Sequence, residues 1–228
     1  MCFSANASFG ASIVLASIGG VTVSKAKEPA LIPFAIIPLM FAVQQATEGV
    51  LWIGLSDPSH ASWRHFPVYI FLTFAQLIWP SWIPFSILLL EKNAIRKRIL
   101  MTLLMMGLCI SFYLLYCLFS YPVSAEIRYG HIHYNLNFPL AFVPISGVLY
   151  FIPTVISLFV SSVKRMPYLG LTILVSFIAT KIFFEDYLIS VWCFFAAILS
   201  LIILGITSSI KDQSSAFIVS AGGLASRK

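Results

Sequence analysis

The sequence predicts an all-α integral membrane protein in which seven helices cross the bilayer. Of its 228 residues, 60% are hydrophobic and only 10% are charged, and the mean hydropathy is +0.96. Soluble domains carry about 25% charged residues, so this composition excludes the soluble globular classes. Seven apolar runs have the roughly 20 residues that a spanning helix needs. We expect one seven-helix transmembrane domain over residues 1–210, followed by a flexible cytoplasmic tail over residues 211–228.

The predicted spans follow one another with short polar connections. They are Ala7–Ser24, Ala30–Ser56, His65–Leu90, Ile95–Ser120, Pro139–Ser162, Tyr168–Phe184 and Tyr187–Ile206. Proline removes a backbone donor and clashes with the preceding turn, so Pro80 and Pro84 predict an irregular third helix. Trp79 and Trp82 are expected in the aromatic belt at the inner boundary. The polar stretch Tyr121–Asn137 is expected to be a loop.

The basic residues predict the orientation of these spans. Eleven of the 14 Lys and Arg residues fall on one side, in the loops after the first, third and fifth spans and in the tail. Cytoplasmic loops of membrane proteins carry such an excess, which places the N-terminus outside and the C-terminus in the cytoplasm. The net charge of +6 therefore reflects topology. We expect the lipid bilayer as a partner and no nucleic acid.

Polar side chains within the second span mark the candidate site. Gln44, Gln45, Glu48 and Trp52 recur at i, i+3/i+4 spacing and so share one helix face. A charge at membrane depth costs several kcal/mol unless it is neutralised or paired, so we expect this face to point into the bundle. Glu48 is the candidate catalytic, proton-carrying or ligand-binding group. The alternative is a structural carboxyl that is hydrogen-bonded to Gln76 or to a hydroxyl.

Other polar residues fall at similar depth in the outer half of the bundle. At a rise of 1.5 Å per residue, Glu48 lies roughly 12 Å below the outer end of its helix and Gln76 roughly 16 Å below. The same count places four more residues at roughly 6–12 Å: Ser146, Ser176, Thr180 and Cys193. These residues predict an outward-facing pocket, centred on Glu48, that binds, senses or passes a small molecule, lipid or proton.

All four histidines are expected on the outer side, which raises the question of a metal site. His60 and His65 lie between the second and third spans, and His131 and His133 between the fourth and fifth. A His-x-His pair places two imidazoles on one side of an extended segment, and Glu48, Glu185 or Asp186 would complete a zinc-like shell. A divalent metal is thus a possible cofactor. The alternative is a set of ordinary polar loop residues.

Two further functions remain open, and the sequence does not decide whether the chain is an enzyme. In the first, a metal held by His131, His133 and a carboxylate activates water, so that the chain hydrolyses lipid of the outer leaflet. In the second, the chain is a structural subunit of a membrane complex. Small residues at four-residue spacing allow close helix packing, and the first span has such a row: Ser8, Ser12, Ala16 and Gly20. The oligomeric state is not predicted.

Three stretches together resemble an uncharacterised bacterial family of multi-pass membrane proteins, a domain of unknown function. They are the start MCFSA-x-ASF, the helix motif QQ-x-x-EG-x-x-W over residues 44–52, and SVWCFFAA over residues 190–197. The resemblance implies a location in the bacterial inner membrane and brings no known activity. The helix count is also similar to that of seven-helix metal-dependent hydrolases such as alkaline ceramidases, but the last span lacks their His-x3-His pair.

Overall fold

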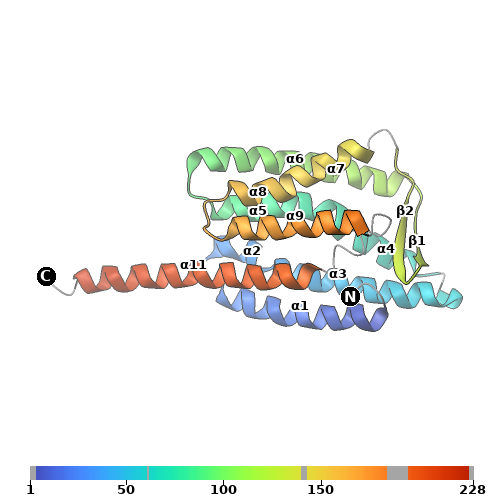
Figure 1. Cartoon of the computed structure of the whole chain (residues 1–228), viewed down its shortest axis with the longest axis horizontal. Coiled ribbons are helices and arrows are strands. Elements are labelled where there is room, and N and C mark those ends of the chain that lie inside the picture. Colours follow the sequence, from blue (N-terminus) through green and yellow to red (C-terminus); the bar gives the residue numbers. More distant parts are fainter. Residues whose placement is uncertain (1–3, 61, 140–142, 184–194, 226–228) are drawn as a thin grey trace.

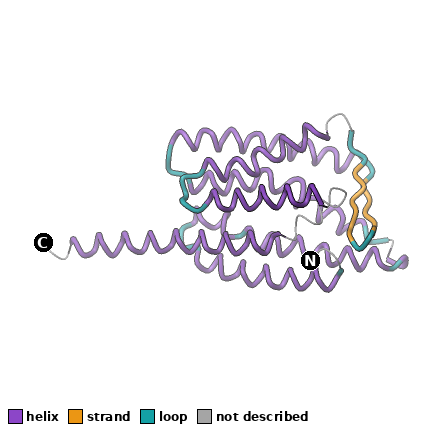
Figure 2. The backbone as a smooth tube through the Cα atoms, viewed as in Figure 1, coloured by secondary structure: helices purple, strands orange, loops and turns teal. Residues whose placement is uncertain are grey.

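The computed structural model describes residues 4–60, 62–139, 143–183 and 195–225, with only the backbone path for residues 58, 143–146 and 211–225. Most of these residues are helical, and the helices lie roughly parallel in an elongated bundle (Figure 1). One end of the bundle carries a β-hairpin that stands across the helices, as Figure 2 shows. The hairpin therefore distinguishes the two ends of the molecule.

The helical elements follow the predicted spans closely along the chain. In order they are α1 (Ala5–Lys25), η1 (Pro29–Leu31), α2 (Ile32–Ala35), α3 (Ile37–Ser56), η2 (Pro58–His60), α4 (His65–Leu72), η3 (Thr73–Ile78), α5 (Trp79–Leu90), α6 (Ala94–Ser120), α7 (Val143–Phe151), η5 (Ile152–Ile156), α8 (Ser157–Val160), α9 (Met166–Phe183) and α11 (Ala196–Ala225). Ser4 caps the start of α1, because its hydroxyl accepts from Ala7 N–H, and Asn93 caps α6 in the same way.

Five of these helical stretches are long and apolar enough to cross a membrane. They are Ala5–Lys25, Pro29–Ser56, His65–Leu90, Ala94–Ser120 and Met166–Phe183. The chain is therefore a multi-pass membrane protein. At the fifth and seventh predicted spans the described residues contain shorter apolar helices, Gly147–Val160 and Ala196–Ile210. Residues 187–194 of the seventh predicted span lie outside the described part of the chain.

Proline interrupts two of the helices, as predicted for the third span. The π-helical turn η3 ends two residues before Pro80, and η5 contains Pro153. Carbonyl groups in η3 accept hydrogen bonds from other helices. The Tyr150 hydroxyl donates to the carbonyl of Ala75 at 2.7 Å, and the Ser111 hydroxyl donates to that of Leu77 at 2.6 Å. Side chains of α6 and α7 thus satisfy backbone groups that a regular helix would use internally.

A glycine permits a close approach of two helices in the bundle core. A Cβ atom on Gly107 of α6 would lie 1.9 Å from the carbonyl oxygen of Pro80 in α5. That carbonyl lies four residues before Pro84, which has no N–H to donate to it. The position therefore requires glycine, and α5 and α6 pack against each other there.

The predicted loop between the fourth and fifth spans is instead a β-hairpin, so the all-α prediction was wrong for this segment. Strands β1 (Val123–Arg128) and β2 (His131–Leu136) pair in antiparallel register, with Glu126 opposite His133. Tyr129 and Gly130 form the turn with φ values of 49° and 76°. Two successive positive φ angles match the right-handed strand twist, which explains a hairpin at this Tyr-Gly pair.

Helix α1 packs along α3 and α11, and only part of the row of small residues noted in its sequence takes part in this packing. Its buried residues are Ser8, Ala11, Leu15, Gly19 and Thr22. Ala16 and Gly20 of the expected row are exposed, whereas the Ser12 hydroxyl donates to the carbonyl of Ala42 at 2.8 Å. These buried residues are three, four, four and three positions apart, because a helix face follows a period of 3.6 rather than 4.

The connections that carry or directly adjoin eight of the 14 Lys and Arg residues lie together at the end opposite the hairpin. These are the connections α1–η1, α5–α6 and α8–α9 (Figure 1). Helix α11 extends past the bundle at this same end, and its backbone remains helical to Ala225. The flexibility expected for residues 211–228 stays a prediction, although the described backbone there is a continuous helix.

Candidate functional site

The polar face of α3 is buried, as its spacing predicted. Gln44 and Gln45 are each 1% exposed, Glu48 is fully buried, and Trp52 is 7% exposed. Nε2 of Gln45 donates a hydrogen bond to a carboxylate oxygen of Glu48 at 3.2 Å. This bond joins residues three apart on one helix, and it differs from the expected partner, Gln76. Because this bond uses the amide nitrogen of Gln45, its Oε1 atom takes no part in the contact with Glu48.

Trp79 is part of this site rather than of an inner aromatic belt. It is 6% exposed, and its indole nitrogen donates to Oε1 of Gln44 at 3.2 Å. Its ring also packs on Phe41, with ring centroids 4.4 Å apart. Trp79 is the first residue after the π-helical turn η3. Its sequence position near the predicted inner boundary gave no sign of this contact, which depends on how α5 turns after η3.

Three buried polar atoms of α3 and η3 have no hydrogen-bond partner among the described residues. They are Oε1 of Gln45, Nε1 of Trp52 and Oε1 of Gln76. Helices α3 and α4–α5 run in opposite directions and meet at the Gln44–Trp79 contact. Glu48 follows Gln44 by four residues and Gln76 precedes Trp79 by three, so both lie about one turn closer to the hairpin end. We call Gln45, Glu48, Trp52 and Gln76 the polar layer.

The other predicted pocket residues either form hydrogen bonds within their own helix or lie outside the described residues. Ser176 and Thr180 of α9 are buried, and their hydroxyls donate to the carbonyls of Ile173 and Ser176 in their own helix, at 2.8 Å each. Such bonds satisfy a serine or threonine locally. The side chain of Ser146 and the whole of Cys193 lie outside the described residues.

The hairpin covers the end of the polar face. Ile132 is fully buried and Tyr134 is 8% exposed, and both belong to one apolar cluster with Trp52 and Phe71. The rings of Tyr134 and Phe71 stack with centroids 5.0 Å apart and planes 5° from parallel. Since alternate residues of a strand face opposite sides, one face of the hairpin packs on the helices and the other presents polar groups.

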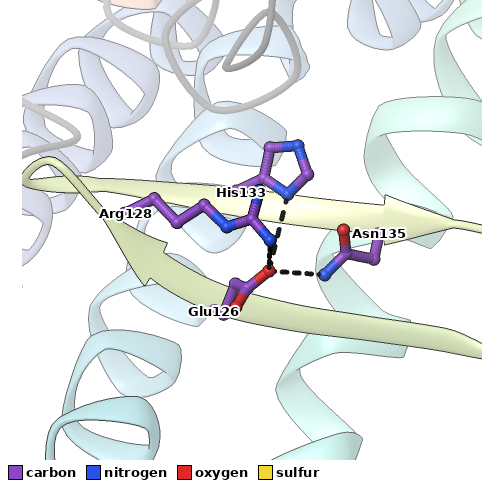
Figure 3. Close-up of polar contacts among 4 residues, drawn as sticks. All are labelled: Glu126, Arg128, His133 and Asn135. Carbon is purple, nitrogen blue, oxygen red and sulfur yellow. Dashed lines mark hydrogen bonds and ion pairs between the residues drawn. The ribbon is translucent and has the colours of Figure 1, made fainter.

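A carboxylate organises the polar face of the hairpin. Figure 3 shows Glu126 with three neighbours. Nδ2 of Asn135 donates to Oε1 of Glu126 at 2.8 Å, Arg128 forms an ion pair with the same oxygen at 2.6 Å, and Nδ1 of His133 lies 4.0 Å from it. The hydrogen bond from Asn135 is the main cause that lowers the pKa of Glu126, and Arg128 lowers it further. The carboxylate is therefore held in its charged form.

The histidines do not form a recognisable metal site with the other described residues. His131 and His133 share a face of β2, as the His-x-His spacing predicted. Nδ1 of His60 lies 3.3 Å from the carbonyl oxygen of Ile53, and His65 begins α4. Within residues 4–60, 62–139, 143–183 and 195–225, no three His, Cys, Asp or Glu side chains converge as metal ligands would. Burial lowers the pKa of His131. Glu185 and Asp186 lie outside the described residues.

A second buried carboxylate, which the sequence reasoning did not single out, lies at the opposite end. Glu91 is 1% exposed and accepts hydrogen bonds from the backbone N–H groups of Lys92, Asn93 and Ser162 at 2.7–2.9 Å. The Ser162 hydroxyl also donates to it at 2.8 Å. Burial alone would raise the pKa of Glu91, but these hydrogen bonds together lower it. Glu91 therefore joins the α5–α6 connection to the α8–α9 connection, which is a structural role.

A family model described as a family of unknown function (DUF6629) matches residues 1–217. The chain belongs to this family. The expected relationship to an uncharacterised family is thereby confirmed. Neither the comparison with curated proteins nor the comparison with solved structures gives a match for the chain. Membership of DUF6629 covers the polar layer and the hairpin together, and it brings no activity with it.

Proposed function

We propose that this protein crosses the bacterial inner membrane seven times, with its N-terminus outside and its C-terminus in the cytoplasm. Five long apolar helices, together with shorter ones at Gly147–Val160 and Ala196–Ile210, support the number of spans. The collection of basic loops at the end opposite the hairpin supports the orientation, because such loops face the cytoplasm. On this view the hairpin and the four histidines are external.

We propose further that the polar layer is the functional site, which binds or passes a small polar ligand or a proton. The observation that carries this proposal is a fully buried Glu48, hydrogen-bonded to Gln45, among buried polar atoms that lack described partners. Each unsatisfied buried polar group costs about 1–3 kcal/mol. If the polar layer only joined helices, the protein would be more stable with hydrogen-bond partners for these atoms. A ligand or transferred water that supplies the missing hydrogen bonds accounts for them.

The test compares wild-type protein with Glu48→Gln in liposomes by infrared difference spectroscopy while the external pH is changed. A functional Glu48 is reached by protons from the outer solution, so the wild type shows a carboxyl band that changes with external pH and is missing from the variant. Glu126→Gln is the control, because it removes a carboxylate of the hairpin instead. If the wild type and Glu48→Gln gave the same difference spectrum, Glu48 would be a closed structural group and the proposal would fail.

A further inference from the structure

We propose that the end of the bundle opposite the hairpin binds the phosphate headgroup of an anionic phospholipid. The site is built from two connections at that end, α5–α6 and α8–α9 (Figure 1). Six exposed basic side chains belong to these connections or to the first five residues of α6: Lys92, Arg96, Lys97, Arg98, Lys164 and Arg165. We call these six residues the basic cluster. It lies at the other end of the molecule from the hairpin and does not depend on the function of the polar layer.

A buried carboxylate holds the two connections of the basic cluster together. Glu91 comes directly before Lys92, and it accepts hydrogen bonds from the Ser162 backbone N–H at 2.7 Å and from the Ser162 hydroxyl at 2.8 Å. Lys164 follows Ser162 by two residues. These hydrogen bonds therefore bring the basic residues of one connection close to those of the other.

The positive charges of the basic cluster are not compensated within the described part of the chain. No ion pair joins any of the six side chains to another described residue. The carboxylate between the two connections, Glu91, brings one negative charge against six positive ones. The N-terminus of a helix is the positive end of its dipole, and Arg96 and Lys97 are the third and fourth residues of α6. A bound anion would relieve the repulsion that this arrangement creates.

Membrane orientation alone does not explain where these residues lie. An excess of Lys and Arg in cytoplasmic loops orients a chain wherever in those loops the residues fall. The connection α1–η1 at the same end has only Lys25 and Lys27 beside it, whereas the other six basic residues are gathered on the two connections that Glu91 joins. This concentration indicates a site for one anion.

The outward side of α6 favours a phospholipid over a soluble phosphate compound. Arg98, Met101, Met105 and Phe112 follow one another at intervals of three, four and seven residues, so they share one side of the helix. All four side chains are exposed, and on a membrane-spanning helix such apolar side chains contact lipid. A phospholipid with its phosphate at Arg98 would have its acyl chains along this apolar strip.

Arg96 extends the site towards the second connection. It precedes the buried Leu100 by four residues, so it lies on the side of α6 that faces the bundle, and α6 packs against α8. Helix α8 ends at Val160 and leads into the connection that carries Arg165. Guanidinium groups bind phosphate oxygens in a bidentate manner. Arginines from both connections are thus available to one phosphate group.

The experiment follows thermal unfolding of the purified full chain in a neutral detergent while one compound is added at a time. The probe is a short-chain phosphatidylglycerol. Phosphatidylcholine with the same chains has no net charge, and glycerol 3-phosphate supplies a phosphate without acyl chains. We expect a saturable rise of the unfolding midpoint with phosphatidylglycerol and little change with the other two, because binding to the native state stabilises it.

Variants of the basic cluster locate the effect. Arg98→Gln should weaken the apparent affinity for phosphatidylglycerol about fivefold, which is the contribution of one basic residue near an anionic lipid surface. Arg96→Gln should weaken it similarly. Without lipid it should not lower the midpoint, because it removes a positive charge from the positive end of the helix dipole. Lys27→Gln is the matched control and should leave the affinity unchanged, since it removes an exposed charge at the same end but outside the two joined connections.

Three results overturn the inference. The first is a wild-type midpoint that rises no more with phosphatidylglycerol than with phosphatidylcholine. The second is an equal rise with glycerol 3-phosphate, which would mean that the cluster binds soluble phosphate compounds. The third is an equal loss of affinity in Lys27→Gln and Arg98→Gln, which would mean that the whole basic end attracts the lipid without a defined site. Each result leaves the proposed role of Glu48 unaffected, because that role is tested by the infrared difference spectrum.

Discussion

The indole nitrogen of Trp79 lies 3.2 Å from Oε1 of Gln44, and this hydrogen bond joins two helices inside the bundle. It fixes the level at which α3 and α5 meet, and thereby the level of Glu48 relative to Gln76. Both partners are nearly without solvent exposure. The contact is therefore the structural support of the polar layer.

We predict that Trp79→Phe destabilises the protein by about 1–3 kcal/mol. The substitution removes the indole N–H that donates to the buried Oε1 atom of Gln44. The measurement is the unfolding midpoint in detergent. Trp63→Phe is the matched control, since Trp63 is 37% exposed and makes no such bond in the described structure. Equal midpoints for the two variants would contradict the importance of the Gln44 contact.

Gly107→Ala is expected to destabilise the bundle by about 1–3 kcal/mol or more, because overpacking of a tight core has this cost. The added methyl group would lie 1.9 Å from the Pro80 carbonyl oxygen, so α5 and α6 must separate. The comparison is with Gly20→Ala, where a Cβ would meet nothing within 4 Å and helix propensity favours alanine. The prediction fails if unfolding of Gly107→Ala is no easier than that of Gly20→Ala.

The helical part of the fold was predictable because its signals are local. Apolar length located the membrane helices, and proline located the irregular turn before Trp79. The burial of Gln44, Gln45, Glu48 and Trp52 followed from their spacing and from the cost of polar groups in lipid. These inferences need only one helix at a time, which is why a single sequence supports them.

The relations between helices were not predictable in the same way. Nothing in the sequence pairs Trp79 with Gln44 or Glu91 with Ser162, because each contact depends on how two distant segments turn. The hairpin was missed for a different reason. Its alternation of Ile132 and Tyr134 with polar residues is a strand pattern, but the Tyr129-Gly130 turn lacks the usual Asn-Gly or Asp-Gly pair.

The hairpin turn provides a third prediction. Gly130 has a φ of 76°, a left-handed conformation that costs an L-residue roughly 1–2 kcal/mol. Gly130→Ala should therefore loosen the hairpin by about this amount, seen as faster amide hydrogen exchange at Ile132 and Tyr134. Tyr129→Asn is the opposite control, since asparagine adopts positive φ more readily than tyrosine, and it should slow the exchange. Unchanged exchange in both variants would contradict the turn geometry.

Glu91 gives the fourth prediction, which concerns acid stability. Its folded-state pKa is lower than the ordinary value of 4.5. A carboxylate of this kind binds fewer protons in the folded state than in the unfolded state, so its stabilisation is complete above pH 4.5 and is lost as the pH falls through the folded-state pKa. The wild type should therefore lose stability below pH 4.5. Glu91→Gln should be less stable at neutral pH, and its unfolding midpoint should fall less steeply in acid.

The double-mutant cycle of Glu91→Gln with Ser162→Ala attributes this effect to the link between the two loops. Ser162 donates to Glu91 through both its backbone N–H and its hydroxyl, and Ser162→Ala removes only the hydroxyl. Hydrogen bonds to charged groups are worth about 1.5–3 kcal/mol, so the two substitutions should be clearly non-additive at neutral pH. Their coupling should shrink in acid, where the carboxyl is neutral in both states. Additive effects at neutral pH would mean that the Ser162 hydroxyl does not contribute to the stabilisation by Glu91, which would then come from the backbone N–H groups of Lys92, Asn93 and Ser162.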